Sequence, residues 1–238
     1  MIGVCVKKNE IIAWSVHAYT ALGLVAAAFS IVFIVMGGDE NLRYAIIMLF
    51  IAIVIDASDG YFARLARVKE VLPYFDGRRL DDIIDFHTYT TIPLLLLWRS
   101  DLLPGTVALI LLIPLLASAY GFSQTNVKTE DGYFLGFPSY WNVIAVYVFL
   151  LRPETWVSVS VIVLFSVLTF VPAKYLYPSL PGPLSKFSVL FGVVWALFMF
   201  SIIIGIADGY GWVIASLAYP IYYVTASWII TIRDYKSS

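Results

Sequence analysis

The chain has 238 residues, of which 61% are hydrophobic and only 13% are charged, and its mean hydropathy is +0.88. This composition excludes an ordinary soluble domain. The formal net charge is −1, and we expect no nucleic-acid partner. A single cysteine, Cys5, excludes a disulfide framework within the chain.

Long apolar runs follow one another from the first residues to the last. A membrane-spanning helix needs about 20 apolar residues, and the runs are separated by short stretches rich in glycine, proline and charged residues. We therefore expect an all-α integral membrane protein, a bundle of about eight transmembrane helices in one membrane-embedded domain, residues 1–238. The expected helices are Ile11–Met36, Leu42–Arg64, Leu80–Trp98, Pro104–Phe122, Leu135–Leu151, Trp156–Tyr175, Phe187–Ala207 and Trp212–Ile232.

Basic residues are distributed unevenly between the two sides of this expected bundle. If the N-terminus is cytoplasmic, all but three of the 15 lysines and arginines lie on the cytoplasmic side. Basic residues near helix ends favour the cytoplasm, so we expect both the N- and C-termini to be cytoplasmic. The three residues on the outer side are Arg43, Arg99 and Arg152.

The first expected helix carries a polar pair, His17 and Thr20, one turn apart on one face. Such a pair in a membrane helix often bonds the backbone or a neighbouring helix. The alternative is that the pair lines a functional cavity, and the two interpretations are equally compatible with the spacing.

Four carboxylates lie where the second expected helix ends and the third begins. Asp56 and Asp59 are three residues apart and Asp81 and Asp85 four, so each pair shares a helix face. A charged side chain at the centre of a membrane helix costs about 2.5–3.5 kcal/mol, so a cation is needed to compensate these four. Two facing carboxylate pairs form an all-oxygen site for one or two hard divalent cations, Mg²⁺ or Mn²⁺.

The residues that follow the first pair favour a phosphate ligand. Gly60 and Ala63 are small enough to let a ligand or a helix backbone approach closely, and the Arg64 guanidinium suits phosphate oxygens. Carboxylates, metals, an arginine and small residues together indicate a site for a pyrophosphate ester. A charged helix cap at the membrane surface would explain neither the pairing nor the Gly-x-x-Ala-Arg sequence.

The order of these residues resembles the signature of the CDP-alcohol phosphotransferases. These integral membrane enzymes move a phosphatidyl or similar group from a CDP-linked donor to an alcohol. The spacing between Arg64 and Gly77 is longer than in most members, and it resembles the bacterial branch that condenses CDP-diacylglycerol with choline; so do the RVKEVLP and KTEDGYFLGFP stretches. The matching positions are Asp56-x-x-Asp59-Gly60-x-x-Ala63-Arg64 and Gly77-x-x-x-Asp81-x-x-x-Asp85.

The resemblance implies a role for each of these residues. Asp56, Asp59 and Asp81 would hold two Mn²⁺ or Mg²⁺ ions. Asp85 would be the general base that takes the hydroxyl proton of the acceptor, and it would also lie within reach of a metal. The remaining positions would bind the nucleotide and its phosphates (Gly60, Ala63, Arg64 and Gly77) or line the cavity (His17 and Thr20).

The resemblance also implies the surroundings of the enzyme. It would be a homodimer among the lipids of a bacterial inner membrane, with its active site facing the cytoplasm. Its substrates would be CDP-diacylglycerol and choline. A quaternary ammonium group binds aromatic faces, each worth about 0.5–2 kcal/mol, often near a carboxylate, so Glu130, Tyr133 and Trp141 are candidates for a choline site. An interfacial belt of aromatic residues explains them equally well.

Two other functions deserve comparison. The first is the same chemistry with inositol phosphate, glycerol phosphate or serine as the acceptor; an anionic acceptor needs a basic cluster, which Arg78 and Arg79 could supply. The second is a divalent-cation transporter. A transporter needs polar residues that continue across the membrane, whereas this acidic cluster lies at the cytoplasmic end, and Asp208 is the only acid near the opposite face in the later helices.

Overall fold

The computed structural model describes residues 8–129, 131–177 and 184–237. The chain forms two compact units, Met1–Ile92 and Pro93–Ser238. All four carboxylates of the predicted metal site belong to the first unit.

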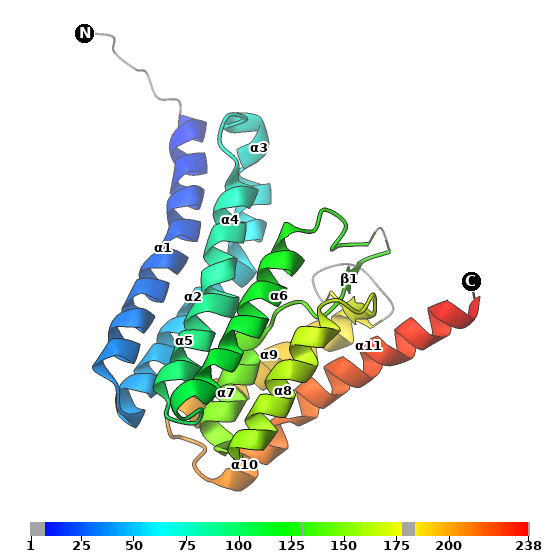
Figure 1. Cartoon of the computed structure of the whole chain (residues 1–238). Coiled ribbons are helices and arrows are strands. Elements are labelled where there is room, and N and C mark those ends of the chain that lie inside the picture. Colours follow the sequence, from blue (N-terminus) through cyan, green and yellow to red (C-terminus); the bar gives the residue numbers. More distant parts are fainter. Residues whose placement is uncertain (1–7, 130, 178–183, 238) are drawn as a thin grey trace. The chain divides into compact units, whose positions relative to one another are not determined.

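The first unit is built on two long helices, α1 (Lys8–Met36) and α2 (Asp39–Leu65), which lie side by side (Figure 1). The connection at residues 37–38 consists of two glycines with φ of 69° and 81°, a backbone conformation that glycine adopts without steric cost. Small residues on the facing sides let the helices approach closely. At one such contact the Ser30 hydroxyl donates a hydrogen bond to the Ala45 carbonyl at 3.0 Å.

The chain then reverses direction through a short structured connection. α2 is followed by a left-handed residue, Arg67, with φ of 48°, and the short helix α3 (Val68–Val71) packs its buried residues against α1. Asp76 is the N-cap of α4 (Gly77–Asp85), because its side chain accepts a hydrogen bond from the Arg79 backbone N–H at 3.1 Å.

α4 continues without a break into a π-helical turn, η1 (Phe86–Thr91), and then into α5 (Ile92–Arg99). The predicted helix Leu80–Trp98 is therefore present, with two differences. It begins three residues earlier, because the Asp76 cap fixes its start, and its middle is widened by the π turn.

The second unit contains the remaining helices and, among the described residues, one pair of short strands. Trp141, Ile162 and Tyr175 are fully buried in its core. In chain order its elements are η2 (Gly105–Leu111, a 3₁₀ helix), α6 (Leu112–Ser123), β1 (Tyr133–Leu135), α7 (Trp141–Leu151), α8 (Thr155–Leu168), β2 (Lys174–Leu176), α9 (Ser185–Ile203), α10 (Tyr210–Ser216) and α11 (Ala218–Ser237).

β1 and β2 pair antiparallel, with Phe134 opposite Tyr175. Gly136 follows β1 with φ of 79°, and its N–H donates a hydrogen bond to the Ala173 carbonyl at 2.9 Å. A side chain at Gly136 would collide with the Thr169 carbonyl, so only glycine lets the two segments approach this closely.

This strand pair corrects two predicted helix boundaries. The helix expected over Leu135–Leu151 begins only at Trp141, because β1 and the turn around Pro138 occupy the first residues. The helix expected over Trp156–Tyr175 ends at Leu168, because its last residues form β2 instead. The last predicted helix is also divided into α10 and α11.

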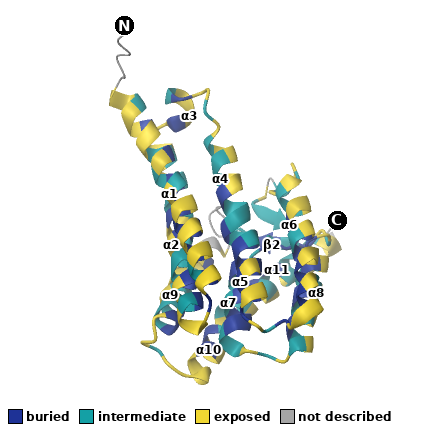
Figure 2. Cartoon of the chain, turned by 60° about the vertical axis from the view of Figure 1, so that its left-hand side comes forward, coloured by how far each residue is buried: buried dark blue, intermediate teal, exposed yellow. Residues whose placement is uncertain are grey.

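Apolar helices dominate the described part of the chain. Five helical stretches are long and apolar enough to cross a membrane, and α7 and α8 are shorter apolar helices. Large apolar side chains remain exposed along them, as the yellow residues of Figure 2 show on α1 and α8, which fits a lipid surrounding. The protein is an all-α multi-pass membrane protein, and its described part contains one small strand pair. The five stretches are Lys8–Met36, Asp39–Leu65, Gly105–Ser123, Lys186–Ile203 and Tyr210–Lys236.

Candidate functional site

Three carboxylates converge between α2 and α4. Oxygen atoms of Asp56, Asp81 and Asp85 all lie within 4.8 Å of one another. We refer to these three residues as the carboxylate cluster. Like charges at this separation disfavour simultaneous ionisation unless a cation compensates them. The structure thus brings together three of the four carboxylates that the sequence predicted to face one another, Asp56 of α2 with Asp81 and Asp85 of α4.

Asp59 lies one turn beyond Asp56 on α2 and is not among the three mutually close groups. It is nevertheless buried, with 7% of its surface exposed, and it lines the same pocket as the cluster. The structure thus places Asp59 at the edge of the site, one turn towards the end of α2.

The pocket is small, with a cavity volume of about 10 Å³, and residues of α1, α2 and α4 line it. Gly23 belongs to its α1 wall, and a Cβ there would lie 3.2 Å from Ile84 Cγ2, so the glycine lets α4 pack close to α1. Sequence reasoning missed Gly23, although it continues the face of His17 and Thr20 at a spacing of three. The lining residues are Thr20, Gly23, Ala52, Ile55, Asp56, Asp59, Asp81, Ile84 and Asp85.

The donor set of this pocket fits a divalent cation. Carboxylate oxygens are the ligands that Mg²⁺ and Mn²⁺ prefer. Asp85 Oδ1 is buried and accepts no hydrogen bond from the described residues, and a buried carboxylate oxygen left in this state is costly. A cation bound by the cluster would satisfy this atom, so the residues fit a metal on chemical grounds.

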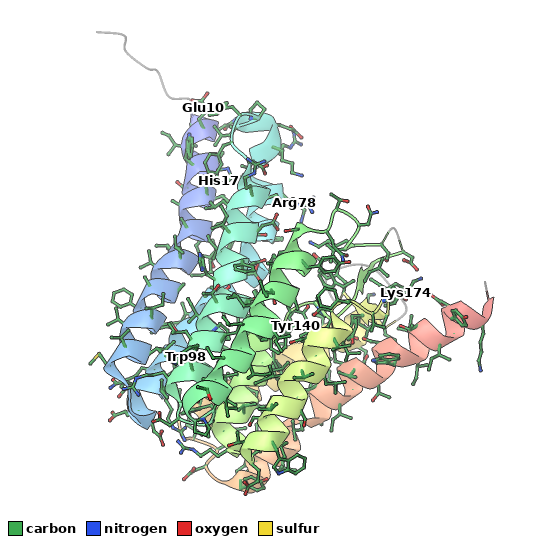
Figure 3. All side chains as sticks on the ribbon, viewed as in Figure 1. Glu10, His17, Arg78, Trp98, Tyr140 and Lys174 are labelled. Atoms are coloured by element: carbon green, nitrogen blue, oxygen red, sulfur yellow. The ribbon has the colours of Figure 1, made fainter. Side chains whose placement is uncertain are left out.

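His17 packs directly against the first residue of α4. A Cβ on Gly77 would lie 2.5 Å from His17 Cε1 and 3.1 Å from His17 Nδ1, so the imidazole fills the space beside that glycine. The His17 ring also contacts Phe75, with the ring centroids 4.4 Å apart. Figure 3 labels the His17 side chain on α1. The residue is 6% exposed, and its Nε2 atom has no hydrogen-bond partner among the described residues.

The polar pair on α1 therefore splits into two environments. His17 and Gly77 lie one helical turn before Thr20 and Asp81 respectively, so the His17–Gly77 contact forms a layer next to the pocket. Thr20 lines the pocket itself, and its hydroxyl donates a long hydrogen bond of 3.4 Å to the Val16 carbonyl in the same helix.

The other signature residues lie along α2 beyond Asp59. A Cβ added at Gly60 would lie 3.5 Å from Arg64 Nη1, which is an ordinary van der Waals contact. Arg64 is exposed near the end of the helix, where its guanidinium can reach a ligand. Ala63 is half-buried and packs against the small cluster around Leu72.

The residues considered for a choline site belong to the second unit. Trp141 is 0% exposed, and its indole N–H donates to the Ser118 hydroxyl at 2.8 Å, so this ring is part of the core. Lys174 Nζ lies 5.4 Å from the centre of the Tyr133 ring. Glu130 lies outside the described residues. The choline site stays a prediction.

Lys174 also joins the connection before β1 to α11. Its ammonium group donates hydrogen bonds to Asp131 and, at 2.8 Å, to Asp234 (Figure 3 labels Lys174). The hydrogen bond from Lys174 holds the pKa of Asp131 below its usual value. The hydrogen bonds to Asp131 and Asp234 raise the pKa of Lys174.

Arg78 and Arg79, the candidate basic cluster for an anionic acceptor, both pair with neighbouring acids. Arg78 Nε lies 4.0 Å from Asp82 Oδ2, and Arg79 Nε lies 3.9 Å from Asp76 Oδ2. All four side chains are largely exposed. These ion pairs give the arginines a local structural role at the start of α4.

Tyr89 is a further residue at the site that sequence reasoning missed. It lies in η1, one turn beyond Asp85, and its hydroxyl donates a hydrogen bond to Asp56 Oδ2 at 2.7 Å. The only signal in the sequence was its spacing of four from Asp85, which places both residues near one face of a helix.

Comparison with known proteins places this site in context. No family model matches the chain. Curated proteins named phosphatidylcholine synthase are similar to it over most of their length. The protein of Pseudomonas aeruginosa is 35% identical over 190 residues, covering 79% of each chain. That of Borreliella burgdorferi is 36% identical over 182 residues, 76% of each. That of Legionella pneumophila is 37% identical over 180 residues, 75% of this chain and 69% of its own.

Proposed function

The chain belongs to the bacterial phosphatidylcholine synthase branch of the CDP-alcohol phosphotransferases, and on this basis we propose that it transfers the phosphatidyl group of CDP-diacylglycerol to choline, giving phosphatidylcholine and CMP. The observation that carries the proposal is the convergence of Asp56, Asp81 and Asp85 in one pocket. In this chain the family signature is thus more than a sequence pattern, because three of its four carboxylates meet in space.

The carboxylates of α2 and of the start of α4 would hold the metal ions. We propose that Asp56, Asp59 and Asp81 bind two Mg²⁺ or Mn²⁺ ions, with Asp85 within reach of one of them. Bound divalent cations supply charge neutralisation on the pyrophosphate of the donor and on the departing CMP.

We propose that Asp85 accepts the proton of the choline hydroxyl. Its Oδ1 is free of hydrogen bonds from the described residues and belongs to the pocket wall, so it can receive a proton without breaking an existing contact. As the proton moves to Asp85, the choline oxygen forms a bond to the phosphorus that carries diacylglycerol. The bond from that phosphorus to CMP breaks in line, and CMP leaves with the electron pair.

The remaining signature residues would orient the donor. Arg64 is exposed beside Gly60, and we propose that its guanidinium binds phosphate oxygens while the small residues of α2 leave room for the cytidine. His17 and Gly77 would close the neighbouring layer, and Nε2 of His17, which has no hydrogen-bond partner within residues 8–129, 131–177 and 184–237, can give or accept one hydrogen bond there.

The proposal includes a membrane arrangement. The enzyme would span a bacterial inner membrane with about eight helices, with both termini and the active site on the cytoplasmic side, where the CTP-derived donor is made. The whole chain would act as one catalytic domain in a homodimer surrounded by membrane lipids. Five long apolar helical stretches and two shorter apolar helices support the multi-pass part of this proposal.

The test is an acceptor panel with purified protein. CDP-diacylglycerol and Mn²⁺ or Mg²⁺ would be incubated with radiolabelled choline, ethanolamine, serine, glycerol phosphate or inositol phosphate, and the lipid products separated. Choline should be used fastest. Asp81→Asn should abolish phosphatidylcholine formation, because a charged group of the cluster is lost, whereas Asp82→Asn, which lies at the surface beside Arg78, should retain it.

Other outcomes would change the assignment. Faster use of serine or glycerol phosphate than of choline would contradict the choline assignment and leave the phosphotransferase chemistry. Absence of CMP release with every acceptor would contradict the enzymatic proposal itself.

A further inference from the structure

A tyrosine that follows the signature residues in the sequence, Tyr89, contacts the carboxylate cluster through its hydroxyl group. Tyr89 Oη donates a hydrogen bond of 2.7 Å to Asp56 Oδ2, joining two residues that are 33 positions apart in the chain. The bond links the helix that carries Asp81 and Asp85 to the helix that carries Asp56.

The backbone around Tyr89 is unusual. It belongs to the π-helical turn η1, which begins directly after Asp85. π-helical turns are rare and are frequently found at functional sites. Thr88 and Thr90 on either side are almost completely buried, and the Thr88 hydroxyl donates to the Ile84 carbonyl at 3.1 Å. The π turn is therefore part of the packed interior, and it fixes where the Tyr89 ring points.

The hydrogen bond has a defined effect on the metal-binding groups. A tyrosine hydroxyl has one proton to donate, so the bond holds one oxygen of Asp56 in place and withdraws part of its negative charge. Asp56 must keep its rotamer for its carboxylate to stay within 4.8 Å of Asp81 and Asp85. Outer partners of this kind orient metal ligands, and their loss commonly weakens metal affinity or activity by about 10–100-fold.

We propose that Tyr89 is a positioning residue for the carboxylate cluster: its hydroxyl holds Asp56 in the orientation that binds a divalent cation. The importance of this contact for turnover rests on the proposed phosphatidylcholine synthase function. Its effect on cation binding does not, and that effect can be measured without substrates.

The experiment compares two tyrosine hydroxyl deletions. Tyr89→Phe keeps the ring and removes the hydroxyl that donates to Asp56. Tyr19→Phe is the matched control, because Tyr19 and Ser58 also share a hydrogen bond between α1 and α2, of 2.8 Å, that touches no carboxylate. Mn²⁺ binding to the purified proteins in detergent is followed by electron paramagnetic resonance of the free ion, and thermal unfolding without metal checks that both variants fold.

The expected result is a specific loss of cation affinity. Tyr89→Phe should bind Mn²⁺ about 10–100-fold more weakly than the wild type, and Tyr19→Phe should bind it normally. In turnover assays Tyr89→Phe should need more Mn²⁺ for half-maximal rate and recover most of its rate at saturating Mn²⁺. In an Asp56→Asn background, Tyr89→Phe should have no further effect on Mn²⁺ affinity, because its partner has changed.

The outcomes separate this inference from the proposed function. Unchanged Mn²⁺ affinity in a folded Tyr89→Phe protein would overturn the positioning role, whatever the enzyme does with choline. Equal weakening by Tyr89→Phe and Tyr19→Phe would overturn it as well, because a general loosening of the helices would then explain both. If Mn²⁺ binding depends on Tyr89 as expected but the wild-type protein makes no phosphatidylcholine, only the proposed function would be overturned.

Discussion

Replacing Gly77 with alanine should damage the fold through a single contact, the one with His17. The added Cβ would lie 2.5 Å from Cε1 and 3.1 Å from Nδ1 of the imidazole. The ring has little freedom to move aside, because Phe75 lies at 4.4 Å and Trp14 at 5.9 Å between ring centroids. Gly77→Ala therefore forces a rigid, buried side chain out of its place.

The size of the effect follows from that clash. Inserting a methyl group into a well-packed interior typically costs about 1–3 kcal/mol. Alanine usually gains about 0.5–1 kcal/mol over glycine inside a helix, but Gly77 is the first residue of α4, where little of that gain applies. The net change in the free energy of unfolding should therefore be a loss of about 1–3 kcal/mol.

The same signature contains a matched control. A Cβ on Gly60 would meet only Arg64 Nη1, at 3.5 Å, and that atom is the far end of an exposed, flexible side chain. Gly60 lies inside α2, so Gly60→Ala should keep or slightly raise the stability of the metal-free protein. Alanine at Gly77 is thus expected to lower the free energy of unfolding, whereas alanine at Gly60 is expected to leave it unchanged or raise it slightly.

The assay is equilibrium unfolding in detergent, without metal or substrate, of the single and double variants of His17 and Gly77. His17→Ala removes the ring, so Gly77→Ala should cost little in that background. The interaction energy from this double-mutant cycle should be about as large as the loss caused by Gly77→Ala alone. Equal losses in both backgrounds, or a Gly77→Ala protein as stable as the wild type, would refute the steric reasoning.

Two further predictions concern single charged side chains. Asp85→Asn should nearly abolish single-turnover phosphatidylcholine formation while donor binding stays within about tenfold, the behaviour of a lost transition-state interaction; recovery of activity on raising Mn²⁺ would instead identify Asp85 as a ligand only. Lys174→Met should remove two ion pairs and lower the free energy of unfolding by about 1 kcal/mol or less per pair, as measured by unfolding in detergent. Because the pKa of Asp131 is lowered in the folded protein, its contribution should be lost as pH falls through that lowered pKa; because the pKa of Lys174 is raised, its contribution should persist at neutral pH and be lost only as pH rises through the raised value. Lys174→Met should therefore remove the part of the acid sensitivity that Asp131 causes, and an unchanged pH profile would contradict this origin.

The helices of the first unit were predictable because the membrane leaves the chain few choices. In a bilayer every backbone group must bond within the protein, so a long apolar run can only be helical. The predicted runs Ile11–Met36 and Leu42–Arg64 accordingly differ from α1 and α2 by no more than three residues at any end. The meeting of Asp56 with Asp81 and Asp85 was also predictable, because the pairs share helix faces on consecutive elements.

The features that the sequence concealed depend on distant partners. β1 and β2 are three residues each and are joined by pairing across about 40 positions, so no local pattern marks them as strands. Trp141, a candidate for a choline site or an interfacial aromatic belt, lies instead in the core of the second unit, where Ser118 supplies a partner for its indole N–H. The π turn that carries Tyr89 has no local signature in an apolar helix, and its contact with Asp56 appears only once α2 and α4 are packed.

Because the carboxylate cluster lies within the first unit, its position has a consequence for the synthesis and membrane insertion of the protein. A chain is made from its N-terminus, and N-terminal units generally fold first. α1, α2 and α4 therefore leave the ribosome before the second unit exists. Until then, the only helices available to shelter the aspartates from lipid are those that carry or adjoin them. Binding of a divalent cation at this stage would lower the cost of inserting the acidic helices. A shortage of the ion would therefore reduce membrane insertion of the protein as well as its turnover rate.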